Sequence, residues 1–210
     1  MHLMSMGYNY VSQKGLKTKY VNAPETKSDP LTNILTDYFT EEYYKLNPSA
    51  EPDAAEKMIN KIQKSLNNDD LGRQFYNEIF LNTGERIIDL SSPTNFYRNN
   101  TFQVATEMTC GSKDGDNFRP DITIFVNGIP LAFIEVKKEN NHKGIQAETE
   151  RMKTRFTTPA FRRFLNLTQI MVFSNDMEYD NNEVTPTQGA FYATIGKKTT
   201  KYNCFRGRSR

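Results

Sequence analysis

Two apolar runs, at residues 121–126 and 131–136, are joined by the pair Asn-Gly, and this feature constrains the chain most. Each run is rich in branched and aromatic side chains, and Asn-Gly between two such runs is typical of a tight antiparallel hairpin. The hairpin also carries charge, because Asp121 begins the first run, and Glu135 and Lys137 lie at the end of the second. The sequence therefore predicts a hairpin with two carboxylates and an ammonium group at its open end.

These three residue types suit the cleavage of a phosphodiester. That reaction needs a cation to offset the charge on the phosphate, an activated water molecule and a managed proton at the leaving oxygen. Carboxylates suit Mg²⁺, which prefers oxygen ligands, so Asp121 and Glu135 are candidate metal ligands. Lys137 is two residues from Glu135 on a strand and shares its face. Charges near strand ends are more often solvated or in a surface ion pair. Here they end an apolar run that we expect to be buried, where ionisable groups need partners.

The orientation of Asp121 depends on the register of the hairpin. With a strict two-residue turn, Asp121 pairs with Ile134 and faces away from Glu135. A shift by one residue pairs Asp121 with Glu135 and puts both carboxylates on one face. Pro130 has no N–H for the ladder, so we predict a bulge or a longer loop beside it. An unbroken hairpin would exclude a site that uses both carboxylates.

The composition indicates a folded protein without a membrane span. The chain has 210 residues, 37% of them hydrophobic and 12% aromatic, with a mean hydropathy of -0.71. No apolar run approaches the roughly 20 residues that a helix needs to cross a bilayer. The N-terminal residues lack the pattern of a secretory signal, so we expect a cytoplasmic protein. The chain has two cysteines, which form no Cys-x-x-Cys pair, and two histidines. A zinc site, a disulfide framework and a histidine-based triad are therefore not expected.

The charge of the chain is unevenly distributed. The formal net charge of +2 is too small to indicate nucleic-acid binding by itself. Basic residues nevertheless exceed acidic ones over residues 137–163, and the end of the chain is basic again. A solvated helical face is the ordinary explanation of such a run, and contact with nucleic acid is the alternative.

The hydrophobic pattern changes along the chain from helical to strand-like. Residues 1–30 are polar and have no sustained period, which predicts an irregular or partly ordered N-terminal arm. Helices are predicted from Pro30 to about residue 47, at 52–66 and at 71–81, followed by a loop with short structure over 85–100. Strands are predicted at 102–108, 121–126, 131–136, 169–174 and 190–195, with a helix over 144–156.

This order of elements predicts an α/β fold, in which helices flank a mixed central β-sheet. We expect one domain over residues 31–210, with a helical part at 31–100 and a sheet core at 101–200. The hairpins supply the antiparallel pairs of the sheet, and the helix over 144–156 supplies a crossover.

The hairpin also resembles a known nuclease signature. Pro120-Asp121, thirteen intervening residues and Glu135-Val136-Lys137 match the pattern PD-(D/E)xK. The stretch RPDITIFVNGIPLAFIEVKK is similar to the N-terminal nuclease domain of the R (restriction) subunit of type I restriction–modification enzymes. The similarity continues through the next helix, QIMVFSNDMEY and the Gln-Gly pair of PTQGAFYA, over roughly residues 70–205. It implies a restriction-endonuclease-like core and a Mg²⁺-dependent endonuclease, with Asp121 and Glu135 as metal ligands and Lys137 as the catalytic lysine.

The resemblance implies supporting residues as well. Many members carry Gln-x-x-x-Tyr on the next helix; here Gln146 is present and Glu150 stands at the tyrosine position, so half of the motif remains. Both residues lie on one helical face. Lys138, Arg151 and Arg155 are candidate contacts to DNA phosphates.

Related nucleases often carry a further acid on an early helix, for which Glu78 is the first candidate and Glu42 the second. A surface carboxylate is the ordinary role of either residue.

The resemblance further implies double-stranded DNA as substrate, and the modification and specificity subunits of a type I complex as partners. The chain has no Gly-x-x-x-x-Gly-Lys-Ser/Thr loop, so ATP would act only through motor domains that the chain does not contain. We expect the N-terminal part of a longer subunit that needs the rest of the complex for activity. A non-catalytic DNA-binding or docking module of the same fold is the alternative, and a stand-alone repair nuclease is a third possibility.

Overall fold

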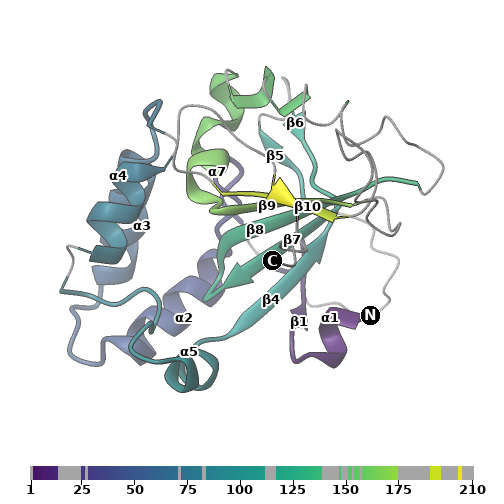
Figure 1. The fold of residues 1–210 in the computed structure, drawn as a ribbon. Coiled ribbons are helices and arrows are strands. Elements are labelled where there is room, and N and C mark those ends of the chain that lie inside the picture. Colours follow the sequence, from purple (N-terminus) through teal and green to yellow (C-terminus); the bar gives the residue numbers. More distant parts are fainter. Residues whose placement is uncertain are drawn as a thin grey trace, which may run out of the picture.

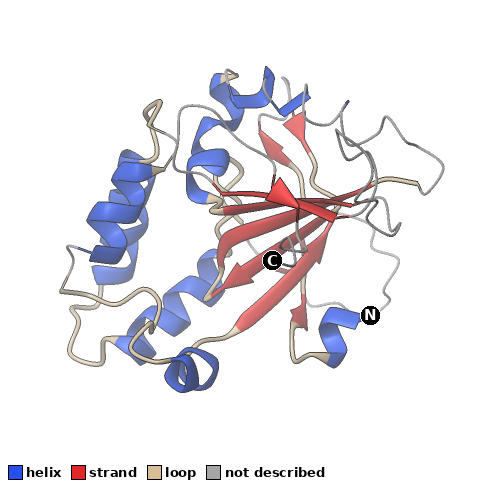
Figure 2. Cartoon of the chain, viewed as in Figure 1, coloured by secondary structure: helices blue, strands red, loops and turns tan. Residues whose placement is uncertain are grey.

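The computed structural model is a mixed α/β fold built around one seven-stranded sheet (Figure 1). It describes residues 2–13, 25–26, 28–70, 72–81, 84–111, 117–138, 147, 151–152, 154–156, 158–174, 190–194 and 203–204. Helices flank the sheet, as the sequence predicts (Figure 2). No helix among these residues is long and apolar enough to cross a membrane.

The central sheet has the strand order β1-β4-β7-β8-β9-β10-β11. Strands β4, β7 and β8 pair antiparallel, β8 and β9 pair parallel, and β9, β10 and β11 pair antiparallel. All five strands predicted from the sequence are present and belong to this sheet. The bounds are Asn9–Tyr10 (β1), Phe102–Thr106 (β4), Ile122–Val126 (β7), Ile129–Val136 (β8), Ile170–Ser174 (β9), Ala190–Thr194 (β10) and Asn203–Cys204 (β11).

Two further two-stranded sheets are separate from the central sheet. Strand β2 (Ser12–Gln13) pairs with β3 (Glu25–Thr26), and β5 (Cys110–Gly111) pairs with β6 (Asn117–Phe118).

The described helices are short. They are α1 (His2–Ser5), α2 (Thr36–Leu46), α3 (Ala54–Ser65), α4 (Arg73–Phe75) with a π-helical continuation η1 (Tyr76–Leu81), α5 (Pro93–Asn99), the 3₁₀ turn η2 (Pro159–Phe161) and α7 (Arg162–Leu167). Helix α2 packs against α3, α3 against α4, and α4 against α7, which also contacts β8 (Figure 1). Residues 151–152 and 154–156 are helical, within the helix predicted over 144–156, most of which lies outside the described residues.

The helix predicted to begin at Pro30 begins later, at Thr36. The preceding segment is a hydrogen-bonded turn, in which the Asp29 carboxylate accepts bonds from the Leu31 N–H (3.0 Å) and from the Thr32 hydroxyl (2.7 Å). Asn33 then adopts a left-handed backbone with φ of 58°. A helix cannot pass through that conformation, so the apolar residues 31–35 pack as a turn.

The N-terminal arm, predicted to be irregular or partly ordered, forms short elements in the part that the structure describes. Strand β1 pairs parallel with β4 at the edge of the main sheet. The Val11 N–H donates to the Val104 carbonyl (2.9 Å), and the Val11 side chain is fully buried. The Tyr10 hydroxyl lies 2.7 Å from the Thr106 hydroxyl. The arm therefore covers an edge strand, whose backbone groups would otherwise be open to another chain.

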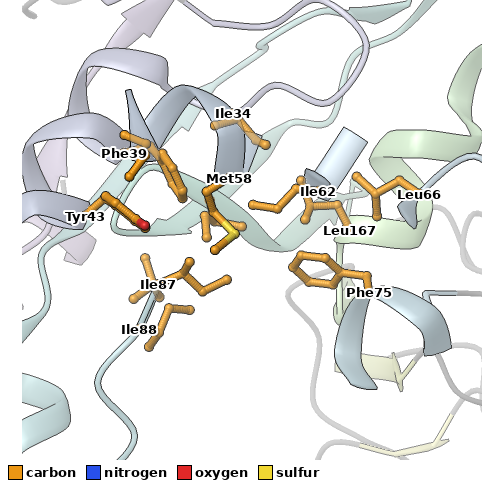
Figure 3. Packing of buried hydrophobic residues seen from close by; sticks show 14 residues of the cluster. Ile34, Phe39, Tyr43, Met58, Ile62, Leu66, Phe75, Ile87, Ile88 and Leu167 are labelled. Atoms are coloured by element: carbon orange, nitrogen blue, oxygen red, sulfur yellow. The ribbon is translucent and has the colours of Figure 1, made fainter. Parts of the chain in front are cut away.

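The largest buried cluster lies between α2, α3 and the hairpin end of the sheet (Figure 3). Ala55, Met58 and Ile62 recur at helical spacing on α3 and are all buried. They pack with Phe39 of α2, and Val126 contributes from the sheet. Helix α3 therefore forms as predicted, because its apolar stripe has a core to face.

The turn between β7 and β8 is buried, although hairpin turns commonly face solvent. Asn127 and Gly128 have φ angles of 51° and 77°, the positive values that a two-residue type I′ turn requires. The Asn127 amide donates to the Ile87 carbonyl (2.9 Å) and to the Asn100 side chain (2.8 Å). The Gly128 carbonyl accepts from the Leu35 N–H (2.9 Å). The turn therefore holds two segments by hydrogen bonds: the residue that precedes α2 and the loop before β4.

Asp89 lies in the loop before β4 and makes the stability of this loop depend on pH. Its carboxylate accepts hydrogen bonds from the Asn99 amide (2.8 Å), the Ser91 hydroxyl (2.6 Å) and the Ser91 N–H (2.9 Å). These bonds favour the ionised form and lower the pKa of Asp89 from 3.8 to about 2. Because the pKa is lower in the folded state, the stabilisation is complete above about pH 4 and is lost as the pH falls towards 2.

We therefore expect Asp89→Asn to destabilise the protein at neutral pH and the difference from wild type to shrink between about pH 4 and pH 2. Urea unfolding across this range measures the difference. Asp37→Asn, at an exposed carboxylate of α2, serves as control. A difference that stays constant with pH would show that the Asp89 charge does not hold this loop.

Candidate active site

The register of the β7–β8 hairpin brings the two predicted carboxylates together. Val126 pairs with Ile129 and Phe125 with Pro130, but the next pair is Ile124 with Ala132. Leu131 is therefore an extra residue on β8, a β-bulge directly after the proline. The predicted disturbance beside Pro130 is confirmed, although the turn itself keeps two residues.

The shifted register continues to the open end of the hairpin. Ile122 pairs with Ile134, so the next residue of each strand places Asp121 opposite Glu135. Opposite residues of an antiparallel pair point to the same face of the sheet. The geometric condition for a site that uses both carboxylates is met.

The backbone fixes Asp121 where β7 begins. Its Oδ2 atom accepts a hydrogen bond of 2.7 Å from the N–H of Val136, the residue between Glu135 and Lys137. Its carbonyl accepts from the Glu107 N–H (3.1 Å), which extends the β4–β7 ladder by one bond. The Asp121 side chain thus accepts the N–H of a β8 residue beyond the end of β7, in place of a backbone carbonyl of β7. This bond holds the Asp121 carboxylate against β8, the strand that leads to Glu135 and Lys137.

Glu135 and Lys137 lie on the same face, as their spacing predicts. The Lys137 Nζ atom is 3.5 Å from Glu135 Oε2, and the exposed fractions of the two side chains are 16% and 7%. The Lys137 N–H donates to the Ser174 carbonyl (2.7 Å), which continues the parallel pairing of β8 with β9. The ammonium offsets the charge of a carboxylate that would be costly to bury alone. A buried carboxylate and a nearby ammonium are therefore held on paired backbone.

An aromatic cluster lies beneath this end of the sheet. Phe133 precedes Glu135 by two residues on the same face and packs against Phe118 and Phe173, with ring centroids 5.5 and 6.1 Å away. Phe173 also pairs with Glu135 across the β8–β9 ladder. This edge-to-face packing holds Phe133 beside Glu135 on the same face of β8.

The predicted DNA contacts have different surroundings. The Arg155 guanidinium lies 4.0 Å from the centre of the Phe118 ring, a cation–π contact. Arg155 therefore takes part in packing beside the site. Arg151 and Lys138 are exposed, and Lys138 directly follows Lys137. Gln146 and Glu150 lie outside the described residues.

Neither early-helix acid is placed beside Asp121 by the described contacts. Glu42 of α2 is buried and lies 2.7 Å from Lys45. It lines the same cavity as Thr101, just before β4, whereas Asp121 bonds to Glu107, just after β4. Glu42 is thus at the opposite end of these strands. Glu78 belongs to η1, where its side chain is not among those described.

Two features of the site carry no sequence signal. The Val136 N–H orients Asp121, and no side-chain pattern marks a backbone donor. Glu107 bonds to the Asp121 carbonyl from a left-handed conformation with φ of 53°. That conformation is uncommon for glutamate.

Comparison with known proteins identifies the family. The chain belongs to the family described as the type I restriction enzyme R protein N terminus, whose model matches residues 1–187. It is 26% identical over 209 residues to the "Putative type I restriction enzyme MjaIXP endonuclease subunit" of Methanocaldococcus jannaschii, a match that covers 92% of this chain and 19% of that protein. It is also 32% identical over 80 residues to the corresponding MjaVIIIP subunit of the same organism, over 38% of this chain and 8% of that protein. The chain thus spans a small part of these relatives.

Proposed function

We propose that this chain is a Mg²⁺-dependent endonuclease domain with a restriction-endonuclease-like PD-(D/E)xK core, which cleaves double-stranded DNA within a type I R subunit. One observation carries the proposal: the bulge after Pro130 sets Asp121 opposite Glu135, with Lys137 Nζ 3.5 Å from the Glu135 carboxylate. Membership of the R protein family supports the same chemistry. Two carboxylates and an ammonium at the open end of one hairpin suit the cleavage of a phosphodiester.

The residues present fit Mg²⁺. The described residues contain no group of three or more Asp, Glu, His or Cys side chains that could hold a metal ion. We therefore assign two protein side chains to the ion. Mg²⁺ is commonly bound through one or two carboxylates while it keeps several waters. Asp121 and Glu135 would hold the ion. It would supply positive charge that stabilises the phosphate as negative charge builds up there.

The chain's own groups would position the substrate. Asp121 is oriented by the Val136 N–H, so its carboxylate does not need to be ordered when DNA binds. Lys137 would donate hydrogen bonds to a non-bridging phosphate oxygen, and its compact charge suits this role. Lys138 and Arg151 would contact neighbouring phosphates, since both are exposed. Hydrolysis adds water across the phosphodiester, breaks one bridging P–O bond and leaves a proton on the departing oxygen.

Membership of the family supports a proposal about the wider assembly. The modification and specificity subunits would be the partners of the complete R subunit, and ATP would act through its motor domains. We expect this chain alone to cleave more slowly than the assembled complex, because the assembly would hold DNA against the site.

A structure soaked with Mn²⁺, together with calorimetric titration of the protein with Mn²⁺, tests the metal site. We expect an ion between Asp121 and Glu135 in the wild-type protein and a much weaker binding isotherm for Asp121→Asn. An ion that binds elsewhere, or DNA cleavage that persists in EDTA, would contradict the proposal. DNA binding without any cleavage by the full assembly would favour a non-catalytic DNA-binding or docking module instead.

A further inference from the structure

Arg119 is an exposed residue between two buried ones, and it lies beside the candidate site in the sequence. It lies between Phe118 and Pro120, both of which are buried, and it precedes Asp121 by two residues. The Arg119 side chain is nevertheless 56% exposed. Its guanidinium is therefore presented to solvent from a segment whose neighbours are locked into the core.

Glu107 faces this arginine from the end of β4. Its N–H is held by the Asp121 carbonyl at 3.1 Å, and the next residue, Met108, is fully buried. Between these two constraints Glu107 adopts a φ of 53°, which costs energy for any residue other than glycine. Glu107 thus lies close to Arg119 on a strained backbone.

Stability does not explain the pairing of these two residues. The Arg119 Nη2 atom is 3.9 Å from Glu107 Oε1, and both side chains are more than half exposed. A pair of this kind contributes little to folding. Backbone strain that the fold maintains beside a candidate active site points to a function instead.

We propose that Arg119 binds a phosphate of the substrate strand next to the phosphate to be cleaved, and that Glu107 holds the guanidinium until DNA displaces it. The inference rests on the proposed function. Arg119 and Asp121 are two residues apart, which is at most about 7 Å along the backbone, and the phosphates of one strand rise by about 3.4 Å per nucleotide. The arginine therefore reaches one or two nucleotides from the cut. A guanidinium suits this task because it can form two parallel hydrogen bonds to one phosphate.

Binding of a labelled DNA duplex in EDTA, measured by fluorescence anisotropy between about 50 and 200 mM salt, tests the inference without cleavage. Arg119→Ala should weaken binding by about fivefold to tenfold. It should also lower the slope of log affinity against log salt by about one, the loss of a single phosphate contact. Glu107→Gln should tighten binding by about twofold to fivefold, because it removes the competing charge.

Three further variants sharpen the test. Arg119→Lys should recover part of the affinity, and Glu107→Gln combined with Arg119→Ala should bind no better than Arg119→Ala alone. Arg98→Ala removes an exposed arginine of α5 that lines the cavity with Thr101, at the opposite end of β4, and it should leave binding unchanged. In cleavage assays with Mg²⁺, Arg119→Ala should raise KM for DNA far more than it lowers kcat.

The outcomes separate this inference from the nuclease proposal. If Arg119→Ala keeps the wild-type affinity and salt slope while Mg²⁺-dependent cleavage continues, the inference is wrong and the nuclease function stands. If the slope falls as expected but the assembled complex never cleaves DNA, Arg119 is a phosphate contact and the nuclease function is wrong. A wild-type protein that binds no DNA would overturn both.

Discussion

Asp121→Asn, Glu135→Gln and Lys137→Met are each expected to lower Mg²⁺-dependent DNA cleavage by at least about 100-fold. The two amides keep the shape of the side chains but remove the negative charge that a metal ion requires. The asparagine oxygen can still accept the Val136 N–H, so the β7–β8 hairpin should stay in register. Methionine keeps the length of Lys137 and removes its charge. The rate of nicking of supercoiled plasmid, by the protein alone and by the assembled complex, measures the effect.

A matched control separates the loss of chemistry from the loss of structure. Glu56→Gln replaces an exposed carboxylate of α3 and should cleave at the wild-type rate. Circular dichroism and thermal unfolding should place all four variants close to wild type. If nicking by the complete assembly survives all three site substitutions, the catalytic role of these residues is wrong. The hypothesis of a non-catalytic DNA-binding or docking module is then favoured.

The hairpin was predictable because its signals agree with one another. Runs rich in branched and aromatic residues predict both strands, Asn-Gly predicts the turn, and Pro130 predicts a bulge that turns Asp121 to the face of Glu135. The same argument could not identify Leu131 as the extra residue, since several bulge positions would restore the register. Leu131 packs against the largest buried cluster, so tertiary packing selects that position.

Other elements depend on contacts between distant parts of the chain. Strand β1 has two residues, Asn9 and Tyr10, and a strand that short has no period to detect. It forms because β4 offers an open edge. The late start of α2 depends on hydrogen bonds of the Asp29 side chain, which compete with the helix that Pro30 would otherwise begin. Both differences come from particular partners that a pattern of apolar residues does not specify.

The candidate site also has a part that the sequence predicts and a part that depends on contacts between distant residues. The spacing of Asp121, Glu135 and Lys137 was visible in the sequence, and the structure places all three at one end of the hairpin. Glu107 and Arg119 become neighbours only because β4 ends opposite the start of β7. The roles of Asp121, Glu135 and Lys137 in metal binding and catalysis, and of Arg119 and Glu107 in DNA binding, stay predictions.

Gly128→Ala is expected to destabilise the protein by about 3 kcal/mol or more. A β-carbon built on Gly128 would lie 2.7 Å from the Leu35 carbonyl oxygen and 2.8 Å from the Phe39 nitrogen. Both are backbone atoms that no rotamer change can move aside. The φ of 77° adds a further cost for any residue with a side chain. Urea unfolding, with the midpoint and slope fitted together, measures the loss.

Gly84→Ala is the matched control for Gly128→Ala, because a β-carbon there would meet no atom within 4 Å. We expect its free energy of unfolding to change by less than about 0.5 kcal/mol. The turn lies at the closed end of the hairpin and Asp121 at the open end, so the folded fraction of Gly128→Ala should still bind Mn²⁺ with wild-type affinity. Equal stability of the two variants would mean that the turn does not pack against Leu35 and Phe39.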